Sequence, residues 1–203
     1  MTVAAHTQNP AHEGRLLAAM ADLVAERGYP AVTVGDVVGR ARVSKRTFYQ
    51  HFADREACFL AVYAAAAEAP MQRIGAVAAD PAVRAGGIAA FVRAAVRAYL
   101  GAMSEQPVLT RTLLTEISSV GPRGWEVRRD VLGRFADQIV QLIDAGRAQE
   151  PGLSTLPRPL ALALVGGINE LVLEAVEAGR AEHLLELETT ATTLVVAVLT
   201  RGD

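Results

Sequence analysis

The stretch SKRTFYQHF, residues 44–52, places two cations, several polar side chains and three aromatic rings within nine positions of a largely aliphatic sequence. In a helix, Phe48 and Phe52 lie one turn apart on the same face, where both can pack into a core. Arg46 and Gln50 then point furthest from that core. The pattern predicts a short helix that is anchored by two phenylalanines and presents a basic, polar face.

A second short helix is expected just before this stretch. Thr33 is a good N-cap for a helix that runs to about Ala41, and Ser44 is a good N-cap for the helix of residues 44–52. Residues 42–43 break the pattern between them. Two short helices joined by a tight turn, of which the second carries the exposed basic face, follow the helix-turn-helix plan.

Longer helices are expected on both sides of this pair. A helix from about His12 to Arg27 ends at Gly28, and Asp54 caps a helix that extends to about Pro70. Further proline and glycine breaks divide the rest of the chain into about five more helices. The sequence therefore predicts an all-α fold of about nine helices.

The outward face of residues 44–52 has the chemistry of a DNA-reading surface. Arginine and lysine pair with guanine edges and glutamine pairs with adenine, while threonine, tyrosine and histidine bind phosphates or thymine methyls. Residues 40–55 carry five basic residues against one acid, whereas acids outnumber bases from residue 61 onward. A basic patch on an otherwise mildly acidic protein is typical of a protein that binds a polyanion through one of its ends. The alternative is an ordinary amphipathic surface helix.

A wider run, AVTVGDVVGRARVSKRTFYQHFADREACFLAVY (residues 31–63), resembles the DNA-binding region of TetR-family transcriptional regulators. The resemblance is specific over about residues 12–63, and beyond them it is one of architecture. The features that carry it are Gly28-Tyr29, Thr33-Val34, Ala41, Val43-Ser44, Thr47-Phe48-Tyr49, His51-Phe52 and Asp54-Arg55-Glu56. The parts it implies are a flexible tail (1–11), a helix-turn-helix DNA-binding domain (12–56) and a ligand-binding and dimerisation domain (57–203).

The resemblance also implies roles for individual side chains. Base-edge contacts are expected from Lys45, Arg46 and Thr47. Phosphate contacts are expected from Thr33, Ser44, Tyr49, His51 and Arg55. Gln50 is added to the DNA-binding set because it lies on the outward face of the helix. For His51, a solvated position near a helix end is an equal alternative.

Arg42 departs from the family pattern, which usually has glycine at this position. The turn often requires a positive φ, which arginine tolerates poorly. Either the turn differs slightly in this chain, or Arg42 accepts the strain and adds a phosphate contact.

The composition limits the classes of protein to which this chain can belong. The chain has 203 residues, is 51% hydrophobic and has a formal net charge of −2, so a sizeable core is expected. The only cysteine, Cys58, excludes an internal disulfide and suits a reducing compartment. The N-terminal residues lack the pattern of a secretory signal, and no stretch reaches the roughly 18 apolar residues of a membrane span. We expect a cytoplasmic protein with no membrane partner.

Polar residues on apolar stripes of the larger domain are candidates for ligand contacts. Buried polar groups cost about 1–3 kcal/mol unless they are satisfied, and a bound ligand is one possible partner. For each residue, a satisfied core hydrogen bond or plain core packing is the alternative. The candidate ligand-binding residues are Tyr99, Met103, Leu113, Glu116, Ile117, Trp125, Phe135, Asn169 and Val172. By family resemblance the ligand is a small molecule, and an apolar pocket favours a hydrophobic or amphipathic one.

The last two helices, residues 160–178 and 184–200, are apolar over more than one face. Helices of this kind are either central or shared with another chain, and we expect a two-fold homodimer. Packing within one chain is the alternative. The candidate dimerisation residues are Leu184, Leu187, Ala191, Leu194, Val195 and Val198.

Catalytic and metal-binding patterns are not found. The pair His12-Glu13 lacks the second histidine of a zinc HExxH helix, and the four histidines and Cys58 have no metal-ligand spacing. We expect no enzyme activity, no cofactor and no metal. The sequence favours a ligand-releasable repressor that binds a near-palindromic operator on double-stranded DNA as a homodimer. Its rivals are a small-molecule-binding protein of the same fold that lacks specific DNA recognition, and a helical enzyme with an unrecognised site.

Overall fold

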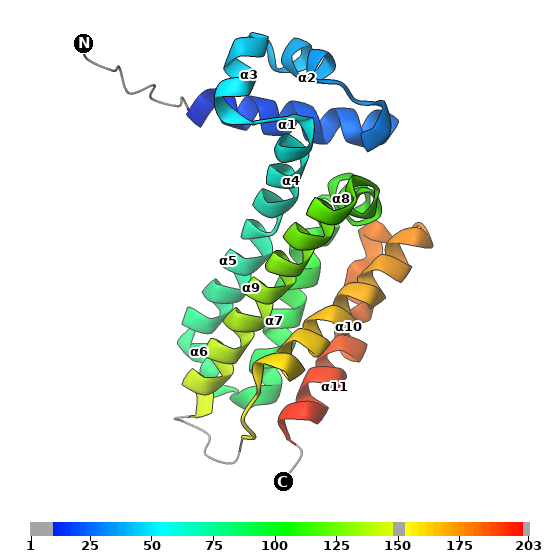
Figure 1. Cartoon of the computed structure of the whole chain (residues 1–203). Helices are drawn as coiled ribbons and strands as arrows, with labels where there is room; N and C mark the ends of the chain where they lie inside the picture. Colours follow the sequence, from blue (N-terminus) through cyan, green and yellow to red (C-terminus); the bar gives the residue numbers. More distant parts are fainter. Residues whose placement is uncertain (1–9, 148–152, 201–203) are drawn as a thin grey trace, which may run out of the picture.

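The computed structural model describes residues 10–147 and 153–200, and these are almost entirely helical (Figure 1). The all-α prediction is confirmed. The α-helices are α1 (Pro10–Arg27), α2 (Val34–Ala41), α3 (Lys45–His51), α4 (Arg55–Ala66), α5 (Glu68–Ala79), α6 (Pro81–Ala85), α7 (Gly87–Ser104), α8 (Pro107–Glu116), α9 (Pro122–Arg147), α10 (Arg158–Glu177) and α11 (Glu188–Leu199). Three 3-10 segments join them, η1 (Tyr29–Ala31), η2 (Ile117–Val120) and η3 (Ala181–Leu187).

Side-chain caps fix the starts of the three helices α2, α3 and α4. The hydroxyl of Thr33 accepts a hydrogen bond from Asp36 N (3.2 Å), and the Asp36 carboxylate accepts one from Thr33 N (2.9 Å). Ser44 Oγ accepts from Thr47 N at 3.0 Å, and Asp54 Oδ1 accepts from the backbone of the first turn of α4 at 2.6 Å. Such caps satisfy backbone donors that a helix start leaves free. The predicted N-caps are confirmed.

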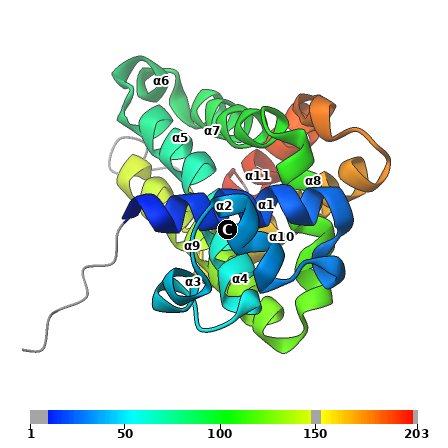
Figure 2. The same ribbon diagram turned by 90° about the horizontal axis from the view of Figure 1, so that it is seen from above.

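The first three helices form a small unit at one end of the molecule. Figures 1 and 2 show α1 lying across the top of the larger helical domain, with α2 and α3 beside it. Phe48 is fully buried and Phe52 is 6% exposed, and their ring centroids are 5.7 Å apart. They pack into the same core as Leu16 and Met20 of α1. The predicted anchoring of α3 by two phenylalanines is therefore confirmed.

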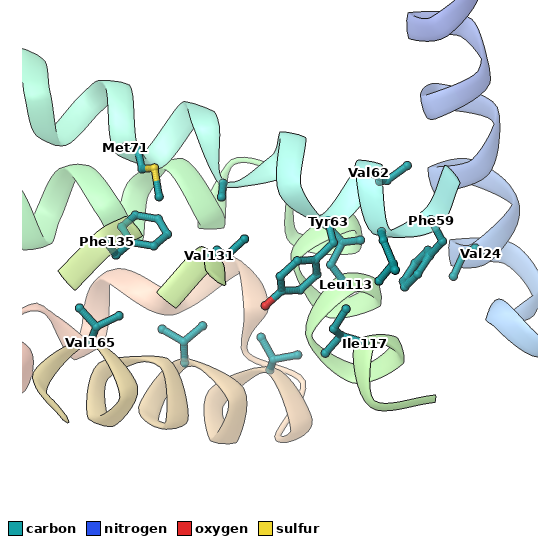
Figure 3. Close-up of a cluster of buried hydrophobic side chains, with 14 of the residues drawn as sticks. Val24, Phe59, Val62, Tyr63, Met71, Leu113, Ile117, Val131, Phe135 and Val165 are labelled. Atoms are coloured by element: carbon teal, nitrogen blue, oxygen red, sulfur yellow. The ribbon is translucent and has the colours of Figure 1, made fainter. Parts of the chain in front are cut away.

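α4 and α5 connect this unit to the larger domain almost without a break, since Ala67 between them has helical dihedrals (φ −74°, ψ −18°). One continuous hydrophobic core runs through both parts. Figure 3 follows it from Val24 and Phe59, past Tyr63, to Phe135 and Val165. A change of packing in the larger domain can thus reach the small unit through contiguous side chains.

The structure corrects several expected helix boundaries. α1 starts at Pro10 rather than His12, because proline is well suited to the first position of a helix. Residues 1–9 of the expected tail lie outside the described residues. The last expected helix, 184–200, is divided into η3 and α11, since His183 has non-helical dihedrals (φ −113°, ψ 23°) and η3 continues to Leu187. α10 is long and apolar enough to cross a membrane, but nearly half of its most apolar residues are buried, and it packs against α9 as a core helix.

Candidate nucleic-acid interface and effector cavity

The outward face of α3 carries the predicted DNA-binding side chains. Ser44, Lys45, Arg46 and Gln50 are exposed, and Tyr49 is 57% exposed. Within residues 10–147 and 153–200, no carboxylate pairs with Lys45 or Arg46, whereas the nearby Arg40 is held by Glu26 at 2.7 Å. A rigid helix therefore presents two uncompensated cations and a phenol to solvent. This combination is suited to phosphates and base edges.

Three other side chains predicted to contact DNA are half-buried or already hydrogen-bonded within the chain. Thr47 is half-buried, and its hydroxyl lies 2.9 Å from Ser44 Oγ. His51 is half-buried and edge-on to His12, with ring centroids 6.5 Å apart. Thr33 is exposed, but its hydroxyl donates to the Asp36 carboxylate at 2.6 Å. Their DNA contacts stay predictions.

The turn between α2 and α3 places Arg42 in the left-handed conformation (φ 53°, ψ 49°). Its N–H donates to Gly39 O at 3.3 Å, and the next residue, Val43, donates to Val38 O at 3.1 Å. These two hydrogen bonds form a Schellman motif, which favours glycine at the left-handed position. Of the two alternatives expected for Arg42, the structure shows the strained backbone, and the phosphate contact stays a prediction.

Replacing Arg42 with glycine is expected to raise the free energy of unfolding by about 1 kcal/mol, because glycine adopts this conformation without a Cβ clash. Chemical denaturation followed by circular dichroism measures the change. Arg42→Ala is the matched control, since it removes the same charge but keeps the strain, and it should not stabilise. If both variants stabilise equally, charge repulsion rather than backbone strain is the cause.

Arg55 has a role that the sequence did not indicate. Its Nη1 donates to the carbonyl oxygens of Tyr29 (3.1 Å), Pro30 (3.3 Å) and Val32, and its guanidinium lies 4.3 Å from the centroid of the Tyr29 ring. It thus fastens the η1 turn, which precedes the cap of α2, to the start of α4. A DNA contact by Arg55 remains a prediction, but the described contacts are internal.

Two polar contacts, here called the interdomain clamp, join the small unit to the larger domain. In the first, the Glu116 carboxylate at the end of α8 accepts from Tyr29 N at 3.1 Å. In the second, Arg123 at the start of α9 binds Asp54 at 3.0 Å and Glu56 at 3.1 Å. The hydrogen bond from the Ala57 N–H, and to a smaller extent Arg123, hold the pKa of Asp54 below its usual value. The clamp ties η1 and α4 to α8 and α9.

The larger domain contains an outer chamber of about 350 Å³. Its walls come from α1, α4, α5, α7, α8, α9 and α10, so the small unit itself supplies part of the lining through Leu17, Ala18 and Ala21. Among mostly apolar side chains it contains the polar Gln106 and Thr110. A largely apolar cavity with a few polar groups is typical of a small-molecule site.

A smaller chamber of about 80 Å³, called the inner chamber below, lies between α5, α7, α9, α10 and α11. The described residues that line it are apolar apart from the Tyr99 hydroxyl, and they include Phe91, Ala95, Val165 and Val195.

A polar cluster lies at the wall of the outer chamber. Asn169 is 4% exposed and its Oδ1 accepts from Arg128 Nη2 at 2.9 Å. Burial raises the pKa of Tyr99 to about 12, and its hydrogen bond with Asn169 opposes the shift. Burial also raises the pKa of Tyr63, whose hydroxyl points between α9 and α10 (Figure 3). Both phenols stay protonated at neutral pH and can donate hydrogen bonds to a bound molecule.

Residues 16–62 match the model for bacterial regulatory proteins of the tetR family. These residues are a tetR-family domain. The match runs from within α1 to within α4 and includes all of α3, the helix predicted to contact DNA. The family resemblance seen in the sequence is confirmed.

Solved structures of tetR-family proteins share the fold along almost the whole chain. A TetR-family protein from Syntrophomonas wolfei has a TM-score of 0.77 at 17% identity, over 96% of this chain and 100% of its own. The fatty acid degradation regulator FadR from Bacillus halodurans has a TM-score of 0.76 at 16% identity, over 94% and 97%. FadR from Bacillus subtilis, in complex with stearoyl-CoA, has a TM-score of 0.75 at 16% identity, over 92% and 98%. No curated protein matches this chain in sequence. At these identities the likeness shows the fold of a tetR-family transcriptional regulator.

The structure brings five of the nine predicted ligand residues to the outer chamber of this tetR-family fold. They are Tyr99, Met103, Leu113, Phe135 and Asn169. The other four lie elsewhere. Glu116 belongs to the interdomain clamp and Trp125 is 58% exposed at the start of α9, whereas Ile117 and Val172 are buried in the core and line neither chamber. A stripe of apolar residues could not distinguish these environments, because core, cavity wall and domain junction all favour the same side chains.

The predicted dimer seam also needs correction. Leu184, Ala191 and Val195 are almost fully buried within the single chain, where η3 and α11 pack against α7. Leu187 and Val198 are half-buried. Leu194 faces outward at 38% exposure. The seam that the sequence favoured is thus mainly the face of η3 and α11 that packs against α7. Apolar residues lie on more than one face of α11, so the pattern did not identify the outward face.

Proposed function

We propose that this protein is a cytoplasmic transcriptional repressor that binds a near-palindromic DNA operator as a homodimer and releases it when a small amphipathic molecule fills the cavity. The DNA-binding part of the proposal rests on how α3 is placed. Phe48 fixes the helix from inside, while Lys45, Arg46 and Tyr49 face solvent without a described carboxylate partner. The tetR-family domain over residues 16–62 supports the same assignment.

The proposed reading mode follows the helix-turn-helix geometry. The N-terminal residues of α3 enter the major groove, where Arg46 and Lys45 reach guanine edges and Tyr49 and Ser44 hold phosphates. A two-fold dimer then reads two related half-sites. The outward side chains Leu160 of α10 and Leu194 of α11, which are 40% and 38% exposed, support a proposed dimer surface over these two helices.

The proposed effector is a straight acyl chain with a polar head group. Two chambers with apolar walls, one of which includes Gln106, Thr110 and Asn169, suit an amphipathic molecule. FadR from Bacillus subtilis, which shares the fold, was crystallised with stearoyl-CoA. Stearoyl-CoA and stearate are therefore the probes of choice.

α8 is the proposed link between cavity and DNA. Its residues Leu109 and Leu113 line the outer chamber, and its last residue, Glu116, holds Tyr29 N. A ligand that displaces α8 would act on the η1 turn and hence on the orientation of α2 and α3. The second clamp contact, at Arg123, keeps α4 attached to α9 and completes the connection.

Replacing Glu116 with alanine is expected to uncouple the two sites. The wild-type protein should lose 5- to 150-fold of its DNA affinity on binding stearoyl-CoA, the usual range of allosteric coupling, and Glu116→Ala should reduce this factor toward one. Fluorescence anisotropy with labelled operator duplex measures both. Glu116→Gln retains an oxygen acceptor for Tyr29 N and should keep most of the coupling, while the exposed Glu174→Ala is the neutral control. An unchanged response in Glu116→Ala would exclude the α8 link.

The test of the DNA-binding proposal is selection of bound duplexes from random DNA by the purified protein at moderate salt. We expect enrichment of a two-fold symmetric motif, lost in Arg46→Ala, and an affinity that falls steeply with salt because several phosphates are contacted. If the protein retains DNA but no motif is enriched, the basic face of α3 binds DNA without sequence specificity. No retention by folded protein would favour a small-molecule-binding protein that has lost DNA recognition.

A further inference from the structure

Two residues, Tyr99 of α7 and Phe135 of α9, line both the outer and the inner chamber. The other residues around the inner chamber do not line the outer one within the described chain. The two rings meet edge to face, with centroids 5.5 Å apart and an interplanar angle of 84°. We propose that this ring pair is a partition that sets how long a straight apolar chain the effector site accepts. The inference rests on the proposed acyl effector.

The two rings are held differently. Tyr99 is fixed at its hydroxyl end by Asn169, which Arg128 holds in turn at 2.9 Å. Phe135 is 6% exposed and, apart from its edge-to-face contact with Tyr99, lies among apolar side chains, with Met71 close by in Figure 3. Phe135 has no polar contact to break when it moves, whereas moving Tyr99 disturbs a buried hydrogen-bond network. Phe135 is therefore the movable half of the partition.

The inner chamber can accept only a chain end. Its volume is about 80 Å³, whereas an apolar cavity of about 150 Å³ is known to hold a benzene-sized molecule. Among the described residues of its lining, Tyr99 alone offers a polar side-chain group, so a head group would remain unsatisfied there. A head group is better placed in the outer chamber, which is lined by Gln106 and by Thr110, whose hydroxyl donates to Met103 O at 2.9 Å and can still accept a hydrogen bond. This fixes the direction of entry, with the tail leading.

The two chambers then distinguish short acyl chains from long ones. A short chain ends in the outer chamber and leaves the ring pair closed. A longer chain passes between Tyr99 and Phe135 and buries its last carbons among Ala95, Val165 and Val195. A branched or ring-bearing tail is too wide to follow, because both walls beside the partition are packed core helices.

The experiment uses straight-chain fatty acids of increasing length, from octanoate to stearate, and their CoA thioesters as separate arms. Isothermal titration gives the dissociation constants for the full-length protein. In the wild type, each added methylene that becomes buried should tighten binding about fourfold, from about 0.8 kcal/mol per buried methylene. The two arms tell whether a carboxylate or a thioester-linked head group is recognised.

Ala95→Leu fills much of the inner chamber. Ala66→Leu adds the same three carbons to the outer chamber and narrows it, since Ala66 of α4 lines only the outer one. Ala95→Leu should weaken stearate at least tenfold while octanoate changes less than twofold. Ala66→Leu should weaken all lengths. Val195→Ile adds one methyl group to the inner wall from another helix, and should act like Ala95→Leu if the larger substitution unfolds the protein. Phe135→Ala should admit a methyl-branched chain that the wild type rejects.

Uniform weakening of every chain length by both inner-wall variants, or no weakening by either, overturns the partition. If no acid or thioester of any length binds the wild type, the proposed effector class fails and the partition fails with it. The DNA selection described above then still stands or falls on its own. Binding that tightens with length but ignores Ala95→Leu and Val195→Ile rejects the partition alone.

Discussion

Replacing Phe48 with alanine is expected to lower the free energy of unfolding by about 3–5 kcal/mol, the usual cost of removing a buried phenylalanine. The side chain is fully buried, and its ring packs against that of Phe52 at 5.7 Å. α3 has only seven residues, so it depends on this anchor for its position. Urea denaturation measures the loss, and DNA binding should disappear together with the fold of the small unit.

The neighbouring Tyr49 is the matched control for Phe48. It lies on the same helix but is 57% exposed. The Tyr49 ring meets the Phe48 ring edge to face, with centroids 5.4 Å apart, so Tyr49→Ala should lower the free energy of unfolding by about 0.5–1.5 kcal/mol and still weaken binding to the selected duplex. A loss of stability in Tyr49→Ala as large as that of Phe48→Ala, or normal DNA binding in a folded Phe48→Ala protein, would contradict the division of α3 into a buried face and a DNA-contacting face.

Replacing Arg55 with alanine is the second large change, with an expected loss of about 2–4 kcal/mol of stability. Hydrogen bonds from a charged donor contribute about 1.5–3 kcal/mol, and a guanidinium over an aromatic ring adds about 0.5–2 kcal/mol. Arg55 makes both kinds of contact, to the carbonyls of the η1 turn and to the Tyr29 ring. Thermal and chemical denaturation measure the effect.

Arg55→Lys separates charge from geometry. Lysine keeps the positive charge for any phosphate contact but lacks the planar fork, so it should recover only part of the lost stability. The exposed Arg93→Ala is the neutral control. If Arg55→Ala leaves stability unchanged and weakens only DNA binding, Arg55 is a phosphate contact and not an internal fastener of η1.

Helix α3, which carries the predicted DNA contacts, could be predicted because the residues that define it are close together in the sequence. Thr33, Ser44 and Asp54 mark helix starts within a few residues of the hydrogen bonds they make, and Phe48 and Phe52 share a face by helical periodicity alone. The glycine pattern of the turn pointed to Arg42 as the strained position, and its φ of 53° shows that strain.

The cavity could be predicted only in part, because its walls come from seven helices distant in sequence. Asn169 and Tyr99 stood out as polar residues on apolar stripes, and both line the outer chamber. Arg128, which holds Asn169, carried no such signal, since an arginine on a long amphipathic helix usually faces water. Likewise, nothing in the pattern around Leu17 indicates that α1 of the small unit forms part of the wall.

Glu116 shows how a correct observation can lead to the wrong site. A carboxylate among apolar neighbours needs a partner, and the sequence suggested a ligand. The partner is the backbone N–H of Tyr29, a residue 87 positions away. Only the packing of η1 against η2, the segment that follows α8, brings the two together. The same limit explains the dimer seam, because the choice between the faces of α11 depends on where α7 lies.

The most direct test of ligand-controlled DNA binding is reciprocal linkage. The affinity of the protein for its selected duplex is measured with and without saturating stearoyl-CoA, and the affinity for stearoyl-CoA is measured with and without duplex. We expect each partner to weaken the other by the same factor, between about 5- and 150-fold. A protein that binds both molecules, each with an affinity that the other leaves unchanged, would contradict the account.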